Sequence, residues 1–474
     1  MKNNKPYKKY RPSEIDWLGD IPEHWEVKRI KYIFKEQDKR SEEGLEDLLS
    51  VSHYTGVTKK SDRYKEGEEI SNAKSLVGYK IVSEGDLVMN IMLAWNGSLG
   101  ISKFNGITSP AYCVFKSLIG GERYFGYLFR TKNAQQEFKK QSTGIIESRL
   151  RLYPDKFFNI KTVVPPKEEQ EKIADFLDYK TAKIDRFIRK KKQLIKLLNE
   201  QKAGIINQAV TKGLDANVKM KPSGIEWLGE IPEHWEVKKL KGICNAFGRI
   251  GFRGYKTTDL VNQGEGAITI SPSNMKYDFM TFEKSTYLSW EKYEESPEIK
   301  IFNDDIIMVK TGSTYGKVGI VKNLEHEATI NPQLLVLKNV TINPNYLYLL
   351  LKSNLIQSQV KAEVIGSTIP TISQTKILNF NLVTPPNEEI QSILIYIEKE
   401  TTILDKTIAT IEKEIALVQE YRAALIAEAV TGKIDIRNYE IPILDEEEAY
   451  EDLEENLEEE LDMVAEDGET MEIE

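Results

Sequence analysis

A long internal repeat limits the possible folds of this chain more than any other feature. Residues 15–31 read IDWLGDIPEHWEVKRIK and residues 225–241 read IEWLGEIPEHWEVKKLK, so 13 of the 17 positions are identical. A second pair of segments, PPKEEQEKIADFLD and PPNEEIQSILIYIE, begins at Pro165 and at Pro385. A period of more than 200 residues greatly exceeds the roughly 20–50 residues of solenoid and propeller repeats. The sequence therefore predicts two duplicated modules, each followed by a simpler element, with internal pseudo-two-fold symmetry.

The segments that follow the two double prolines have the pattern of long helices. Residues 167–211 contain no proline and a single glycine, and glutamates in the first turn favour a helix N-terminus. Apolar or small residues recur every seven positions on two lines, which are interrupted by Lys191, Lys202 and Arg422. The predicted core of a helix pair is Leu177, Ile184, Ile188, Ile195, Leu198, Ile205, Ile397, Leu404, Ile408, Ile411, Ile415, Val418 and Leu425. Equal lengths favour an antiparallel coiled coil, although two unrelated long helices would show the same spacing.

The segments that precede these helices are predicted to be strand-rich, mixed modules. Short runs of Val, Ile, Tyr and Phe are separated by Gly, Asn and Ser, and residues 123–141 have a helical pattern. DLVMNIMLAWNGSLGI, from Asp86, and DIIMVKTGSTYGKVGI, from Asp305, share a framework, whereas the rest differs. We predict an α+β fold with five parts: a first module at 1–164, a long helix at 165–215, a second module at 216–384, a long helix at 385–435 and an acidic tail at 436–474.

Charge is distributed unevenly along the chain. Residues 440–474 contain 18 Asp and Glu and no Lys or Arg, so the net charge of −9 for the whole chain corresponds to +9 for residues 1–439. A basic body favours a polyanionic partner, and a run of like charges with few aromatic residues is typical of disorder. Two hypotheses remain for this tail: it is a solubilising extension, or it competes with DNA for the basic surfaces.

Other features exclude several classes of protein. Only two cysteines, Cys113 and Cys244, are present, which excludes a disulfide scaffold. No apolar run reaches the roughly 18 residues of a membrane span, and the basic N-terminus is not followed by an apolar signal segment. We therefore expect a cytoplasmic protein with no membrane partner.

Motifs for catalysis, nucleotide binding and metal binding are missing from the sequence. TGSTYGKVG, from Thr311, differs from a phosphate-binding loop because three residues, not four, separate Gly312 from Gly316, and Val318 stands where Ser or Thr is required. The four histidines lack metal-ligand spacing, and no Cys-x-x-Cys is present. We expect no catalytic residue, no metal site and no cofactor on this chain.

The order of these motifs resembles the DNA-specificity subunit of type I restriction-modification systems. WLGDIPEHWEVKRI, WLGEIPEHWEVKKL and PPKEEQEKIADFLD carry the resemblance, which extends from residue 13 to about residue 435. The resemblance implies two target recognition domains for a bipartite target, with two half-sites at a fixed spacing, and two central antiparallel helices. It also implies a non-catalytic chain whose partners are double-stranded DNA, two methyltransferase subunits and motor-nuclease subunits, with S-adenosylmethionine, ATP and Mg on those partners. A coiled-coil protein–protein scaffold and a modification-only methyltransferase complex remain as alternatives.

Polar and basic loop residues are the candidates for contacts with DNA. Phosphate contacts supply affinity, and contacts with base edges supply the choice of sequence. An ordinary surface role is the alternative for each candidate. The candidates are Lys59, Lys60, Arg63, Asn96 and Arg149 in the first module, and Arg249, Arg253, Asn274, Thr314, Tyr315 and Lys317 in the second.

Overall fold

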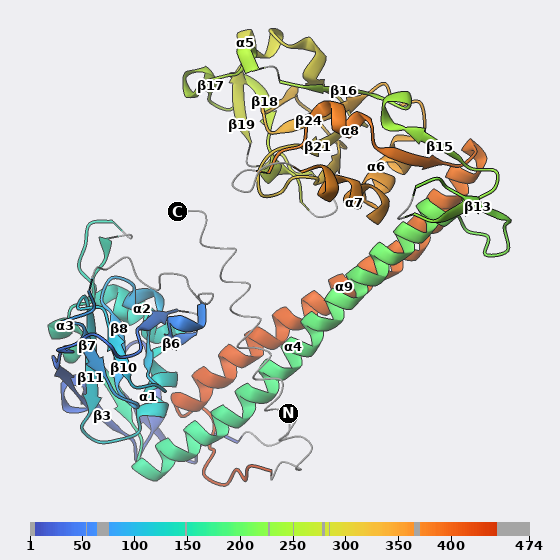
Figure 1. The fold of residues 1–474 in the computed structure, drawn as a ribbon. Coiled ribbons are helices and arrows are strands. Elements are labelled where there is room, and N and C mark those ends of the chain that lie inside the picture. The colour runs from blue at the N-terminus through green and yellow to red at the C-terminus, as the bar shows by residue number, and fades with distance from the viewer. Residues whose placement is uncertain are drawn as a thin grey trace. The chain divides into compact units, whose positions relative to one another are not determined.

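The computed structural model divides into two units (Figure 1). It describes residues 5–53, 55–63, 75–146, 149–225, 228–249, 251–276, 280–283, 285–364 and 370–442. The first unit contains residues 1–190 and 413–474, and the second contains residues 191–412. Each unit therefore combines one module with the beginning of one long helix and the end of the other.

The first module is built around an antiparallel four-stranded sheet. The order in this sheet is β4 (Phe34–Gln37), β11 (Tyr112–Ser117), β8 (Leu87–Asn90) and β9 (Leu99–Ile101). Four antiparallel pairs complete the module: β1 (Tyr10–Pro12) with β2 (Asp20–Pro22), β3 (Glu26–Arg29) with β12 (Lys161–Val164), β5 (Leu49–Ser52) with β6 (Gly56–Lys59), and β7 (Lys80–Val82) with β10 (Gly106–Thr108). Its core is aromatic: the rings of Phe34 and Phe125 lie 5.5 Å apart, and those of Phe115 and Phe157 lie 5.2 Å apart.

The helices of the first module differ from the single helix predicted over residues 123–141. The structure has α1 (Glu122–Phe129), α2 (Lys132–Gln141) and α3 (Pro154–Asn159). The chain breaks at Thr131, whose extended backbone and side-chain hydroxyl, which accepts a hydrogen bond from the Ala134 amide, form the N-cap of α2. Residues of α1 and α2 pack on the same core, so the apolar pattern continues across Thr131 and does not reveal the break between the two helices.

The second module repeats the four-stranded sheet of the first and adds a further sheet. The repeated sheet has the order β16 (Asn245–Gly248), β24 (Leu334–Lys338), β21 (Ile306–Val309) and β22 (Val318–Ile320). The added sheet has the order β17 (Leu260–Val261), β19 (Thr286–Ser289), β18 (Gly266–Ile270), β23 (Ala328–Ile330) and β20 (Lys300–Ile301). Two antiparallel pairs are β13 (Met220–Pro222) with β14 (Glu230–Pro232) and β15 (Glu236–Lys239) with β25 (Asn381–Thr384). The helices are α5 (Trp290–Glu294), α6 (Pro344–Lys352), α7 (Asn354–Glu363) and α8 (Gln374–Leu378).

Two long helices follow the modules, and they pack against each other (Figure 1). Helix α4 spans Lys167–Lys212 and helix α9 spans Asn387–Val430. Each begins after a double proline and ends near a glycine with positive φ, Gly213 or Gly432, as is common at helix C-termini. In each unit the beginning of one helix packs on the end of the other, so the pair is antiparallel. The predicted α+β fold, with its internal repeat and antiparallel long helices, is confirmed.

Candidate nucleic-acid interface

Both modules are attached to the helix pair. The contact face between the two helices, here called the seam, follows the seven-residue pattern of the sequence. None of the thirteen predicted core residues is exposed. Five of them are buried, namely Leu177, Ile397, Ile411, Ile415 and Leu425, and the other eight are half-buried. The half-buried positions are those expected of a two-helix layer, in which only one side of each seam residue meets a partner.

Lys202 and Arg422, which interrupt the apolar lines, form ion pairs between the helices. In the first unit Arg422 Nε lies 3.0 Å from Asp185 Oδ1, and in the second unit Lys202 Nζ lies 2.7 Å from Asp405 Oδ1. The members of the two pairs correspond at the 220-residue offset of the repeat, since 202 matches 422 and 185 matches 405. A charged pair within an apolar seam favours one alignment of the helices, because a shifted alignment would bury the charges without partners.

The repeated IPEHWE motif joins each module to the beginning of its own long helix. His24 Nε2 lies 2.9 Å from Glu169 Oε2, and His234 Nε2 lies 2.7 Å from Glu389 Oε2. Both glutamates are in the first turn of their helices, where a negative charge is also stabilised by the helix dipole. The two histidines therefore have a structural role in attaching modules to helices.

A second attachment holds each module to the end of the other long helix. The buried Tyr124 hydroxyl donates a 2.7 Å hydrogen bond to the carbonyl of Val430, and Tyr346 donates a 3.0 Å hydrogen bond to the carbonyl of Val210. Burial raises the pKa of both phenols, so they remain donors. Each module therefore contacts both helices through residues at equivalent positions of the repeat.

The candidate residues of the first module have different environments. Lys59 is engaged with Asp47 at 2.8 Å, and Lys60 is half-buried. Asn96 and Arg149 are exposed, in the turn between β8 and β9 and in the loop before α3. The side chain of Arg63 lies outside the described part of the chain. The role of these residues in binding DNA stays a prediction.

Two candidates of the second module have structural contacts that leave them little access to DNA. Arg249 is 5% exposed, and its guanidinium donates to the carbonyl of Ile330 and to the Thr329 hydroxyl. Asn274 is 3% exposed and donates to the carbonyl of Thr281. Each side chain holds adjacent loops together in this structure, and the role of both residues in binding DNA stays a prediction.

The other candidates of the second module are more accessible. Arg253 is half-buried beside Glu298, at 3.4 Å. Thr314 is exposed and Tyr315 and Lys317 are half-buried, all in the turn between β21 and β22. Lys310 begins this turn, is half-buried, and was not among the predicted contacts. The repeat contained the signal, because Lys310 stands where the first module has Ile91.

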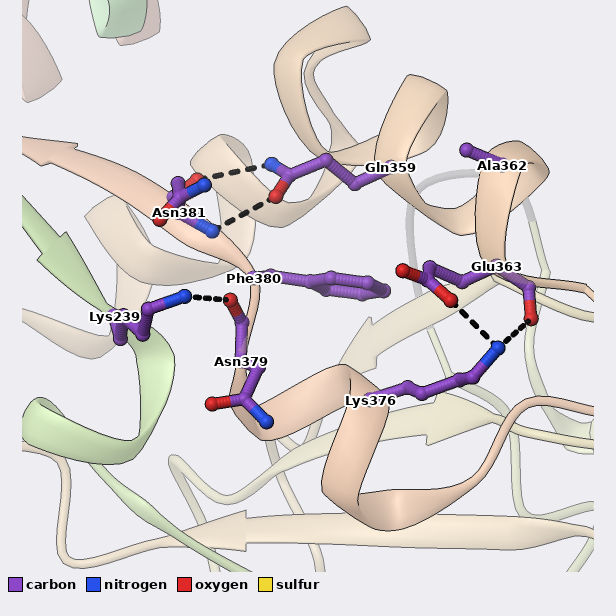
Figure 2. Close-up of a pocket in the computed structure, with 8 residues that line it drawn as sticks. All are labelled: Lys239, Gln359, Ala362, Glu363, Lys376, Asn379, Phe380 and Asn381. Carbon is purple, nitrogen blue, oxygen red and sulfur yellow. Dashed lines mark hydrogen bonds and ion pairs between the residues drawn. The ribbon is translucent and has the colours of Figure 1, made fainter. Parts of the chain in front are cut away.

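A pocket of about 300 Å³ lies in the second module beside α7 and α8 (Figure 2). Its lining consists of Lys239, Gln359, Ala362, Glu363, Lys376, Asn379, Phe380 and Asn381. The side-chain amide of Gln359 forms two hydrogen bonds with the backbone of Asn381, and Lys376 is paired with Glu363 at 2.6 Å. A ligand would have to replace hydrogen bonds and an ion pair that these groups already make. The pocket therefore offers few polar groups for binding a ligand.

The family model described as type I restriction modification DNA specificity domain matches residues 22–197 and 232–418, which together exceed half of the chain. The chain belongs to this family. Each matched segment covers most of one module and a large part of the helix that follows it, so the specificity family accounts for the internal repeat.

Individual members of the specificity family resemble the chain over most of its length. The MjaVIII specificity subunit of Methanocaldococcus jannaschii is 25% identical over 442 residues, which cover 91% of this chain and 98% of that protein. The MjaIX specificity subunit of the same organism is 24% identical, with 88% and 95% covered. A solved structure from work on complex assembly of the type I R-M system has a TM-score of 0.60 at 14% identity, and it covers 87% of this chain and 99% of that one. This last likeness shows a shared fold.

The described residues contain no cluster of three or more His, Cys, Asp and Glu side chains that could hold a metal ion. In the same part of the chain, no helix combines the length and apolar character needed to cross a membrane.

Proposed function

We propose that this specificity-family chain recognises a bipartite target in double-stranded DNA, with one half-site for each module. The observation that carries the proposal is that the two modules share their attachments to the helix pair but differ in their loops. His24 and His234 make equivalent contacts with helix α4 and helix α9, respectively. The turns between β8 and β9 and between β21 and β22, in contrast, have unlike side chains. A shared framework with unlike loops suits recognition of two different sequences.

The length of the helix pair suits a spacing function. Helix α4 has 46 residues and α9 has 44. At a rise of about 1.5 Å per residue, each is about 66–69 Å long. Base pairs of B-DNA are about 3.4 Å apart, so this length corresponds to about 20 base pairs, close to two helical turns. We propose that the helix pair sets the spacer between the two half-sites.

The exposed faces of the long helices suit the binding of partner subunits. Leu197 and Leu417 occupy equivalent positions of the repeat and are 55% and 65% exposed. Further exposed apolar side chains on the two helices are Phe187, Leu194, Ile395, Tyr396, Ile403 and Tyr421. We propose that helices of two methyltransferase subunits pack on these faces to form a bundle, and that motor-nuclease subunits join the assembly.

In this proposal the chain itself is non-catalytic. S-adenosylmethionine, ATP and Mg would be bound by the partner subunits, and this chain would position them on DNA. A modification-only complex, without motor-nuclease subunits, is the second candidate within the same function. A scaffold that binds only proteins is the competing class, and salt-sensitive binding of the complex to duplex DNA would argue against it.

Mapping of methylated adenines in host DNA, with and without the gene for this chain, tests the proposed function. We expect a split motif of two short blocks and a fixed gap that disappears when the chain is absent. Replacing residues 216–384 with the second module of another specificity-family chain should change one block and leave the other block and the gap unaltered. A contiguous motif, or a change in both blocks, would contradict the proposal.

A further inference from the structure

The turn between β21 and β22 differs in chemistry from its equivalent in the first module. Residues 91–98 of the first module read IMLAWNGS and contain no Lys or Arg, and Met92 and Leu93 are 37% and 43% exposed. Residues 310–317 of the second module read KTGSTYGK. One turn thus presents apolar side chains, whereas the other presents two lysines and several hydroxyl groups on the same framework.

The turn between β21 and β22 is held in a defined conformation. The Gly316 amide donates to the carbonyl of Val309 at 2.8 Å, and the Gly312 amide donates to the carbonyl of Pro370 at 3.0 Å. Gln357 Nε2, from α7, donates to the carbonyl of Gly316 at 3.2 Å. Gly316 has φ of +80°, and a Cβ at this position would lie 2.7 Å from Val360 Cγ1, so glycine is needed there. The side chains of the turn are therefore carried on a rigid support.

A third lysine belongs to the same region. Met275 and Met280 form an isolated antiparallel bridge, and both side chains pack over β22, because a Cβ on Gly319 would lie 3.1 Å from Met275 Cε and 3.2 Å from Met280 Sδ. Lys276 follows Met275 and is exposed. Lys317 immediately precedes β22, so Lys276 and Lys317 lie on adjacent segments.

In the described part of the module, these lysines lack the carboxylate partners that other lysines have. Ion pairs elsewhere in the module join Lys292 to Glu295, Lys300 to Glu294, Lys322 to Asp304, Lys338 to Asp305 and Lys376 to Glu363. Within the residues that the structure describes, Lys276, Lys310 and Lys317 make no ion pair and no side-chain hydrogen bond.

The surroundings of Lys310 and Lys317 disfavour a positive charge in the unbound protein. Burial lowers the pKa of Lys310. The pKa of Lys317 is lowered by burial and then by the charges of Lys276 and Lys352. Within the described residues, Lys276 and Lys317 repel each other and neither is paired with a carboxylate, and the phosphates of a polyanion would relieve this repulsion.

We propose that Lys276, Lys310 and Lys317 bind phosphate groups of the DNA backbone at the half-site of the second module. This inference rests on the proposed function and adds the residues and the chemistry of one half-site. Lysine is a compact point charge that suits a phosphate, whereas arginine has the planar fork that suits bidentate contact with a guanine edge. The first module has no lysine in its equivalent turn, so the same contacts are absent from that turn.

The test uses the complex of the full chain with its methyltransferase subunits and a duplex that contains the mapped target. Binding is measured by fluorescence anisotropy between about 50 and 200 mM salt, a range over which phosphate contacts dominate the change in affinity. Each of Lys276→Gln, Lys310→Gln and Lys317→Gln should reduce the slope of log K against log salt by about 0.9, and the triple variant by about 2–3. The loss should be uniform across duplexes that vary in the second half-site.

The matched controls are Lys241→Gln and Lys361→Gln, which remove exposed lysines of the same module outside this turn. They should leave the slope unchanged. Because Lys310 is half-buried, thermal melting checks that its variant folds, and the exposed Lys276 provides an independent variant. An unchanged slope in the triple variant would overturn the inference, as would loss of discrimination at one base pair with an unchanged slope.

A failure of the proposed function and a failure of the phosphate-binding assignment would give different results. If the wild-type complex produces no split methylation motif, the proposed function is wrong. If it produces the motif and the triple variant retains the wild-type slope, only the phosphate-binding assignment is wrong.

Discussion

The ion pair between Lys202 and Asp405 provides a sharp test of how the helix seam is stabilised. The Lys202 side chain is 13% exposed, and Asp405 is 51% exposed. Two unit charges about 3 Å apart interact by about 5 kcal/mol at an effective dielectric constant of about 20, but desolvation of the lysine offsets most of this gain. We expect Asp405→Ala to lower the free energy of unfolding by about 1–2 kcal/mol, because Lys202 loses this carboxylate in a largely dry environment.

The substitution Lys202→Leu should have a different effect from Asp405→Ala. It places an apolar residue on an apolar line and leaves Asp405 with access to water, so we expect a change between zero and a gain of about 1 kcal/mol. A change of 1 kcal/mol shifts the melting temperature by about 2–4 °C in a unit of 150–250 residues. Asp405→Ala should therefore lower the melting temperature of the second unit by about 2–8 °C.

The assay is thermal and urea unfolding of the full chain followed by circular dichroism. Glu398→Ala, which removes an exposed carboxylate from the same helix, is the control and should change stability by less than about 0.5 kcal/mol. If Lys202→Leu destabilised the chain as much as Asp405→Ala, the explanation that Lys202 needs this carboxylate would be refuted.

Three further predictions concern other parts of the chain. Leu197→Asp and Leu417→Asp should weaken binding of the methyltransferase subunits in pull-down experiments without lowering the melting temperature, because both side chains are exposed. A lower melting temperature would mean that these side chains stabilise the fold of the chain itself. Deletion of residues 440–474 should raise the affinity for non-specific DNA at low salt, and an unchanged affinity would reject competition by the acidic tail. Burial raises the pKa of Cys113 and of Cys244 to about 12, so iodoacetamide at pH 8 should label them only after unfolding; rapid labelling of the native chain would contradict this burial.

The helix pair and the repeat could be predicted from the sequence because their signals are local and periodic. The double prolines determine where α4 and α9 begin, and the seven-residue spacing determines which face is buried. Even the interruptions are informative, since Lys202 and Arg422 have their aspartate partners at the repeat offset. The histidines of the two IPEHWE motifs make equivalent hydrogen bonds with Glu169 and Glu389, in keeping with their repeated position.

The loops of the modules could be predicted much less well. Whether a loop residue faces solvent depends on contacts between distant segments, so Arg249 and Asn274 could not be distinguished from exposed residues by type alone. Thr131 ends an apparently continuous helical pattern because its side chain caps a new helix. Lys310 could have been found by comparing the two copies position by position, since a lysine replaces an isoleucine there.

The spacing function of the helix pair is tested most directly by lengthening both helices and mapping the methylated motif again. Three heptads inserted at the midpoints of α4 and α9 add about 31 Å, which corresponds to about nine base pairs and nearly one full turn of DNA. We predict the same two sequence blocks separated by a gap about nine base pairs longer. The same two blocks with an unchanged gap would contradict the account.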